Sequence, residues 1–294
     1  TQDKVIASIA PIASSSVMAA AQVNESAKIL GISPTASNPN VTVDPETGKV
    51  RDYLFRATFI DPFQGAVMAN FAKNTLKAQK AAVYIENSSD YAKGLGKFFK
   101  ETFVQNGGNI VSDEAYLAKD TDFKATLTKI KASNPDVIFV PGYYQEVGMI
   151  IKQAREIGIT VPILGADGWD SAKLPEIAGA EALNNTFFSN HYSPDDNSPE
   201  IKNFVEAYKA EYGQVPDAFA ALSYDATMMI IEAIKRAGVE DSVKVKDELA
   251  KTKDYQGVSG SITLDEKHNA VKGVVIIEMK NGIQAFKEKI KPLS

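Results

Sequence analysis

Apolar residues follow two alternating spacings along the chain. Short apolar runs bounded by turn residues are typical of buried strands, and they alternate with longer segments of helical period. The strands predicted in this way are residues 4–10, 81–85, 109–116, 137–140, 163–165 and 186–190. The predicted helices are residues 17–30, 62–76, 91–105, 122–132, 145–157, 201–212 and 218–237. This alternation indicates βαβ units and a mainly parallel α/β sheet.

Turn residues support several of these ends. Gly31 follows the first helix, Asp61 precedes Pro62 as a helix cap, and Asn-Gly-Gly at 106–108 ends the third helix. In the last third of the chain, residues 260–265 and 273–290 read as strands joined by turns. Asn281-Gly282 is a hairpin signal, so we expect antiparallel strands at this end of the chain.

Composition narrows the class of protein. With 294 residues, 44% hydrophobic and 23% charged, the chain is that of a globular protein, and two lobes fit the length. The net charge is −5 and the lysines are spread evenly, which argues against a nucleic-acid partner. No apolar run approaches the roughly 20 residues of a membrane span. Residues 1–10 lack the features of a signal peptide, which is compatible with a mature, processed or truncated chain.

Candidate chemistry lies in the loops that follow the predicted strands, where ligands bind in open α/β sheets. The first loop, "PIASSS", offers Ser14, Ser15 and Ser16 at a helix start, a receptor for a carboxylate or phosphate. Its alternative interpretation is ordinary helix capping. The loop "SPTASNP" holds Thr35 and Ser37, but loops of this composition are commonly plain turns.

Later loops carry an acid and aromatic residues. "GADGWD" places Asp167 and the single tryptophan, Trp169, after a buried strand, where the acid pairs with a cation or is a solvated turn residue. Tyr91, Tyr143 and Tyr144 suit a pocket wall or a half-buried surface. The early loop offers hydrogen-bond donors for an anion, and the later loop offers an acid for a cation. Together these two loops would complement the two charges of a zwitterion.

Signatures of enzymes, cofactors and metals are weak. The chain has no cysteine, no phosphate-binding glycine loop, no nucleophile elbow and no zinc motif, so we expect no cofactor, no metal and no catalytic residues. The two histidines, His191 and His268, are expected to be surface residues in polar loops. A hydrolase based on the serine triplet would lack a base near it in the sequence.

Four stretches of this sequence resemble one family in order and spacing. They are "PIASSSVMAAAQVNESAKILGISPTASNP", "NSSDYAKGLGKFFKETFVQNGG", "DFKATLTKIKASNPDVIFVPGYYQEVGMIIKQAREIG" and "ILGADGWD". The family is the extracytoplasmic solute-binding proteins of branched-chain amino-acid ABC transporters. The resemblance implies a two-lobed type I periplasmic-binding-protein fold, with a mainly parallel sheet flanked by helices in each lobe.

The resemblance also implies roles for individual residues. Ser14, with Ser15 and Ser16 beside it, would hold the carboxylate of the ligand, and Thr35 and Ser37 match the family's second ligand loop. Further residues matched in this way are Tyr91 and Tyr143 facing the ligand, Asp167 receiving its α-ammonium, and Phe219, more loosely with Tyr224, bordering its side chain. Trp169 is a candidate on position alone. Asp167 is shorter than the glutamate of the best-known member.

The family's three crossings between lobes would fall near residues 56–61, 190–193 and 265–273. Lobe one would then be residues 1–57 and 191–265, and lobe two residues 58–190 and 266–294. Family members carry two further strands and helices before the segment that matches residues 4–10. We therefore expect a fragment or truncated chain whose lobe one is N-terminally incomplete, remodelled, or completed by a partner chain.

The function implied is capture of a neutral or branched-chain L-amino acid in the inter-lobe cleft for delivery to a membrane permease. The protein would be periplasmic, or lipid-anchored at the outer face of the membrane. Two alternatives remain open from the sequence. One is an amino-acid or amide sensor that signals through a partner protein, and the other is a truncated form that no longer binds ligand.

Overall fold

A computed structural model describes residues 3–291, and the chain divides into two compact units. The first unit comprises the chain up to Ile60 and Asp196–Gly273, and the second comprises Asp61–Asp195 and Val274–Ile290. The three breaks lie 3, 5 and 8 residues beyond the predicted lobe boundaries after residues 57, 190 and 265. The predicted lobe boundaries therefore stay a prediction that differs from the compact units by these few residues.

The second unit contains a seven-stranded sheet in the order β13-β12-β8-β7-β6-β4-β5. Its parallel strands are β4 (Lys80–Glu86), β5 (Asn109–Tyr116), β6 (Val137–Phe139), β7 (Ile163–Gly165) and β8 (Thr186–Asn190). Antiparallel strands β12 (Val274–Lys280) and β13 (Ile283–Ile290) complete it. Asn281 and Gly282, with φ of 50° and 79°, form the tight turn between them, which confirms the predicted hairpin.

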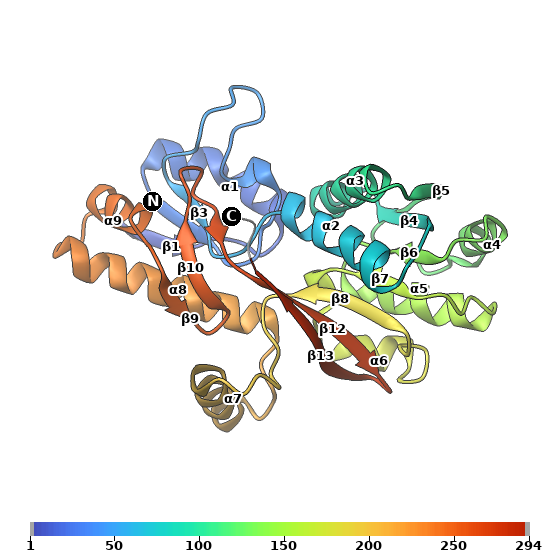
Figure 1. Ribbon diagram of the computed structural model, residues 1–294. Helices are drawn as coiled ribbons and strands as arrows, with labels where there is room; N and C mark the ends of the chain where they lie inside the picture. The colour runs from blue at the N-terminus through green and yellow to red at the C-terminus, as the bar shows by residue number, and fades with distance from the viewer. Residues whose placement is uncertain (1–2, 292–294) are drawn as a thin grey trace. The chain divides into compact units, whose positions relative to one another are not determined.

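Helices cover both faces of this sheet (Figure 1). They are α2 (Asp61–Asn70), its π-helical continuation η2 (Phe71–Thr75), α3 (Asp90–Gln105), α4 (Lys124–Ala132), α5 (Tyr144–Glu156) and α6 (Lys173–Ala178). Side chains alternate between the faces because the strand period is two. In β6, Phe139 stacks on Phe99 of α3 at 4.3 Å, whereas Ile138 packs into the core beneath α4 and α5.

The first unit holds two small sheets. Parallel β1 (Ala7–Ile9), β2 (Leu30–Ser33) and β3 (Leu54–Arg56) form one, and antiparallel β9 (Tyr255–Gly257), β10 (Gly260–Leu264) and β11 (Ala270–Val271) form the other. Its helices are α1 (Ser14–Ala27), η1 (Pro39–Val41), α7 (Pro199–Tyr212), α8 (Ala218–Ala237) and α9 (Ser242–Ala250). Residues of α1 pack with Leu54 in one apolar cluster, and residues of α8 and α9 pack with Ile32 and Phe55 in another.

Strand β1 lies at the edge of its sheet. Within residues 3–291 it pairs with β2 alone, and Ile9 and Val5 are 42% and 47% exposed. An edge strand with exposed apolar side chains offers unpaired backbone groups to another strand.

The structure corrects several predicted elements. The first helix ends at Ala27 rather than residue 30, because Lys28 adopts the left-handed conformation (φ 53°) that ends it, and Gly31 lies inside β2. The predicted strand 4–10 shortens to Ala7–Ile9. Strands β2, β3, β9 and β11 and helices α6 and α9 were not predicted. Across residues 3–291, no helix has the length and apolar character of a membrane span.

Candidate functional site

A buried carboxylate, Asp167, is the centre of one cluster of predicted site residues, and it lies wholly within the second unit. Asp167 begins the short 3-10 turn η3 (Asp167–Trp169) that follows β7. Its Oδ1 accepts hydrogen bonds from the Tyr91 hydroxyl at 2.7 Å and from Gln64 Nε2 at 2.8 Å. Its Oδ2 lies 3.1 Å from His191 Nε2. Two helices, α2 and α3, and the residue that follows β8 therefore hold a single acid in place.

These donors keep Asp167 ionised. Burial by itself raises the pKa of a carboxyl, but the hydrogen bond and charge of His191, together with the Tyr91 and Gln64 hydrogen bonds, lower the pKa of Asp167 below its usual value. A buried carboxylate with polar donors on one side can bind a cationic group of a ligand on the other. Gln64 Oε1, buried beside it, has no hydrogen-bond partner among the described residues.

Tyr91 and Tyr143 form an aromatic pair next to Asp167. Their ring centroids are 5.3 Å apart, and the Tyr91 hydroxyl also accepts the Gly168 N–H at 3.0 Å. Burial, and then the charge of Asp167, raise the pKa of both phenols, so both remain neutral donors. A Cβ at position 168 would lie 2.6 Å from the Gly142 carbonyl oxygen and 3.2 Å from the Tyr91 ring, so glycine permits this close packing.

A second cluster lies in the first unit, at the start of α1. The Ser14 hydroxyl accepts the Asn38 N–H at 3.2 Å, and the Thr35 hydroxyl donates to the Ile12 carbonyl at 2.8 Å. The Arg56 guanidinium, fully buried, donates to the Ala36 and Asn38 carbonyls. The loop 33–39 is thereby held against the start of α1.

Two features of this cluster point to an anion. Helix α1 begins with Ala13 as its N-cap, so the prediction that a serine occupies the N-cap position is wrong. Helix starts bind anions through their backbone amides. The Ser37 hydroxyl is buried and has no hydrogen-bond partner among the described residues.

The remaining predicted residues lie apart from these clusters or pack elsewhere. Ser15 and Ser16 follow Ser14 in α1 with exposed side chains, and Phe219 is half-buried in the first turn of α8. Tyr224, 47% exposed, contacts Phe204 of α7. Trp169 is fully buried in the core of the second unit and donates to the Val140 carbonyl, contacts that explain its burial without a ligand.

Both histidines differ from the expectation of surface residues. His191 is 3% exposed because it directly follows the buried strand β8 and bonds to Asp167. His268 is half-buried, and its ring stacks on Phe55 at 3.8 Å. Gln64 was also not predicted as a site residue, because a glutamine inside a helix carries no sequence motif that indicates binding. The closeness of His191 to the end of a predicted strand was the one signal available.

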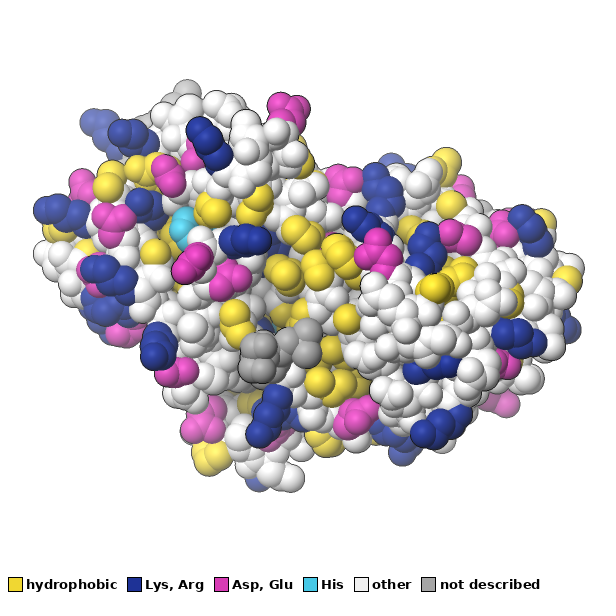
Figure 2. Space-filling view, turned by 45° about the horizontal axis from the view of Figure 1, so that its top comes forward, with side chains coloured by type: hydrophobic (Ala, Val, Ile, Leu, Met, Phe, Trp, Pro, Cys, Tyr) yellow, Lys and Arg dark blue, Asp and Glu magenta, His cyan; other side chains and the backbone are white. Residues whose placement is uncertain are grey.

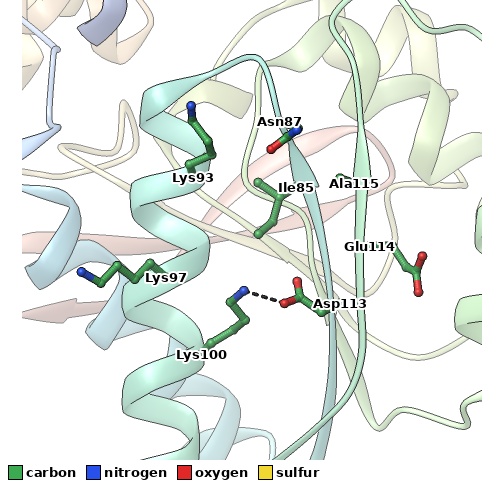
Figure 3. Close-up of a pocket in the computed structure, with 8 residues that line it drawn as sticks. All are labelled: Ile85, Asn87, Lys93, Lys97, Lys100, Asp113, Glu114 and Ala115. Carbon is green, nitrogen blue, oxygen red and sulfur yellow. Dashed lines mark hydrogen bonds and ion pairs between the residues drawn. The ribbon is translucent and has the colours of Figure 1, made fainter.

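A separate pocket of about 350 Å³ lies between α3 and strands β4 and β5 of the second unit (Figure 3). Lys100 bridges to Asp113 at 2.6 Å across it. None of the predicted site residues lines this pocket. On the face shown in Figure 2, basic and acidic side chains are intermixed rather than gathered by sign. Residues 3–291 contain no cluster of three metal-ligating side chains.

The folds and clusters described above are those of a ligand-binding protein with two α/β units. The periplasmic binding protein family model matches residues 1–284, so the chain belongs to this family.

Relatives within the family are named as amino-acid-binding proteins. The leucine-specific-binding protein of Salmonella typhimurium is 30% identical over 261 residues, which are 88% of this chain and 68% of the relative. The leucine-binding protein LivK of Thermotoga maritima is 40% identical with a TM-score of 0.93. LivJ of Streptococcus pneumoniae, solved in complex with isoleucine, is 41% identical with a TM-score of 0.92. In both structural comparisons, 99% of this chain and 81% of the solved chain are covered.

Proposed function

We propose that this chain is the substrate-binding component of an ABC importer and that it binds a neutral or branched-chain L-amino acid without altering it. The observation that carries this proposal is the buried, ionised Asp167, which is held by Tyr91, Gln64 and His191. A carboxylate in this environment can receive an α-ammonium group. The isoleucine complex of LivJ supports the ligand class.

The first-unit cluster supplies the complementary chemistry. We assign the ligand carboxylate to the start of α1 with Ser14 and Ser37, because amides and hydroxyls there are suited to an anion. Ser15, Ser16, Thr35, Tyr143 and Phe219 are assigned to the remaining contacts. The partner for delivery is a membrane permease, and the location is extracytoplasmic, either in the periplasm or lipid-anchored at the outer face of the membrane.

Calorimetry against a panel of L-amino acids tests the function directly. We expect saturable binding of leucine, isoleucine or valine, and a loss of at least about 100-fold in affinity in Asp167→Asn, because an ammonium then lacks a buried counter-charge. Asp170→Asn is the matched control, a second buried acid three residues away that bonds to Asn190 and Gln284. Absence of heat with every neutral amino acid, or unchanged affinity in Asp167→Asn, contradicts the proposal.

The edge strand β1 supports a second proposal, that a strand from a partner chain pairs with β1 and completes lobe one. Its exposed Ile9 and its single strand neighbour in residues 3–291 are the reasons. Light scattering and hydrogen exchange test this. We expect an assembly larger than one chain with slow exchange at Ala7–Ile9, both lost in Ile9→Lys. A monomer with fast exchange at β1 contradicts the proposal.

A further inference from the structure

His191 contacts the acid that the proposed function assigns to the ligand's ammonium. It follows β8 directly, is 3% exposed, and places Nε2 at 3.1 Å from Asp167 Oδ2. Tyr91 and Gln64 bond to the other oxygen, and neither of them becomes a cation. His191 is therefore the one of these three donors that can take up a proton and become a cation.

The two charge states of His191 give the cluster different affinities for a cation. Neutral His191 donates one N–H and leaves Asp167 with its full negative charge. Protonated His191 forms a buried ion pair with Asp167, and the pair has no net charge. An ammonium group arriving beside that pair would place two positive charges on one buried carboxylate, which burial makes unfavourable.

We propose that the proton on His191 and the α-ammonium of the amino acid compete for Asp167, so that capture of the amino acid expels a proton and acidification releases the amino acid. This inference rests on the proposed function. It makes His191 a positioning residue that sets the charge of the ammonium site.

Other titratable groups lie around this cluster. Those of the same unit are Asp61 of α2, Glu86 at the end of β4, Tyr91 of α3, Tyr143 before α5 and Asp170 after η3. All are acids or phenols. The pKa of Asp167 itself is held below its usual value, so Asp167 remains charged between pH 5.5 and 7.5. Burial raises the pKa of Glu86, so the His191→Gln variant is needed to separate the contribution of His191 from that of Glu86.

Linkage fixes the size of the effect. If binding expels one proton, affinity falls by up to tenfold for each pH unit below the pKa of His191 in the unliganded protein. In calorimetry of leucine or isoleucine binding, we expect affinity to weaken at least about fivefold from pH 7.5 to pH 5.5. Buffers of different ionisation heat should report release of up to one proton per ligand.

The test compares wild type with His191→Gln, whose amide keeps a donor but cannot be protonated. We expect pH-independent affinity and no proton release in this variant. His268→Gln, the chain's other histidine, lies in the first unit and should behave as wild type. As a measurement that needs no variant, ligand should lower the pH at which one histidine ring signal titrates by NMR.

The outcomes separate the two claims. If wild type binds no amino acid at any pH, the proposed function fails, and this inference with it. If wild type binds equally well at pH 7.5 and 5.5, or if His191→Gln keeps the pH dependence, the competition is overturned while the proposed function stands. Binding with no shift in either histidine signal also overturns it.

Discussion

Glu86 is a buried acid outside the two clusters. It is 5% exposed at the end of β4 and accepts a hydrogen bond from the Ser88 hydroxyl at 2.9 Å. Burial raises the pKa of Glu86, and the charge of Glu146, 9% exposed in the first turn of α5, raises it further. The ionised form of Glu86 therefore lowers the stability of the folded second unit.

Replacing Glu86 by glutamine should stabilise the protein at pH 7. The pKa of Glu86 is higher in the folded than in the unfolded protein, so the free energy of unfolding falls as the pH rises and Glu86 ionises. Glutamine does not ionise and therefore avoids this loss of stability. We expect thermal unfolding to shift upward by about 2–4 °C, the effect of roughly 1 kcal/mol in a domain of this size. The gain should shrink toward pH 4, where Glu86 is largely protonated in both the folded and the unfolded state.

Glu114 of β5 provides the control for this variant, since it already pairs with Lys129 at 2.8 Å. Glu114→Gln should give no gain in melting temperature at pH 7. A lower melting temperature of Glu86→Gln at pH 7, or a gain that is undiminished at pH 4, would refute the assigned cause.

At the scale of residues, position along the chain predicted part of the site. Asp167, Tyr91 and Tyr143 follow different strands of a parallel sheet, and the structure brings them into contact because the carboxyl ends of those strands share one edge. Gln64 could not be predicted, and for His191 only its position after a predicted strand was a signal. Both residues contact Asp167 only because helix α2 and the end of β8 pack next to it in the tertiary structure. No local sequence pattern indicates that packing.

At the scale of elements, the long periodic segments and several short buried strands of the second unit were predicted, whereas β2 and β3 of the first unit were not. Helix α8 and strands β5, β7 and β8 have the predicted bounds. Strand β2 was missed because Gly31 was taken as the end of the preceding helix, whereas the left-handed residue that ends this helix is Lys28. Strand β3 has three residues, one of them a fully buried arginine, and tertiary hydrogen bonds rather than apolar periodicity hold it in the core.

Asp225 joins three elements of the first unit. From α8 it accepts the N–H groups of Val258 and Ser259, both at 2.8 Å, in the turn between β9 and β10. It also accepts the Ser259 hydroxyl, and Lys272, just before β12, donates to that hydroxyl. Both Asp225 and Lys272 are 1% exposed.

Asp225→Ala should therefore destabilise the first unit by about 3–5 kcal/mol, because the buried N–H groups of Val258 and Ser259 and the Ser259 hydroxyl lose their acceptor. Asp217→Ala at the start of α8 is the comparison. It removes one capping bond to the Ala220 N–H and should cost only about 1 kcal/mol. Urea unfolding measures both, and equal losses in the two variants would contradict the role of Asp225.

At the scale of the whole molecule, each unit has its own core and draws on separate stretches of sequence. Hydrophobic periodicity predicted parallel βαβ units, but it carries no information on which strands share a sheet. The expectation of lobes built from discontinuous segments came from the family resemblance alone.

Ligand should stabilise the whole molecule if the proposed function holds. At a free amino-acid concentration of 100 times Kd, the free energy of unfolding should rise by about 2.7 kcal/mol. Differential scanning calorimetry should then show the melting temperature raised by roughly 5–10 °C. Asp167→Asn should show no such rise at the same concentration, and neither should wild type with the D-enantiomer. Equal shifts for both enantiomers would contradict specific binding.

The order in which the chain is synthesised affects when the sheet of the second unit can be completed. Strand β12 lies between β8 and β13, and both β12 and β13 come from residues 274–290 of the 294. At synthesis rates of about 5–20 residues per second, the 100 residues between the end of β8 and the end of β13 take roughly 5–20 seconds. During that interval the edge of β8 is open to aggregation, and a chaperone that shields strand edges would have its substrate there.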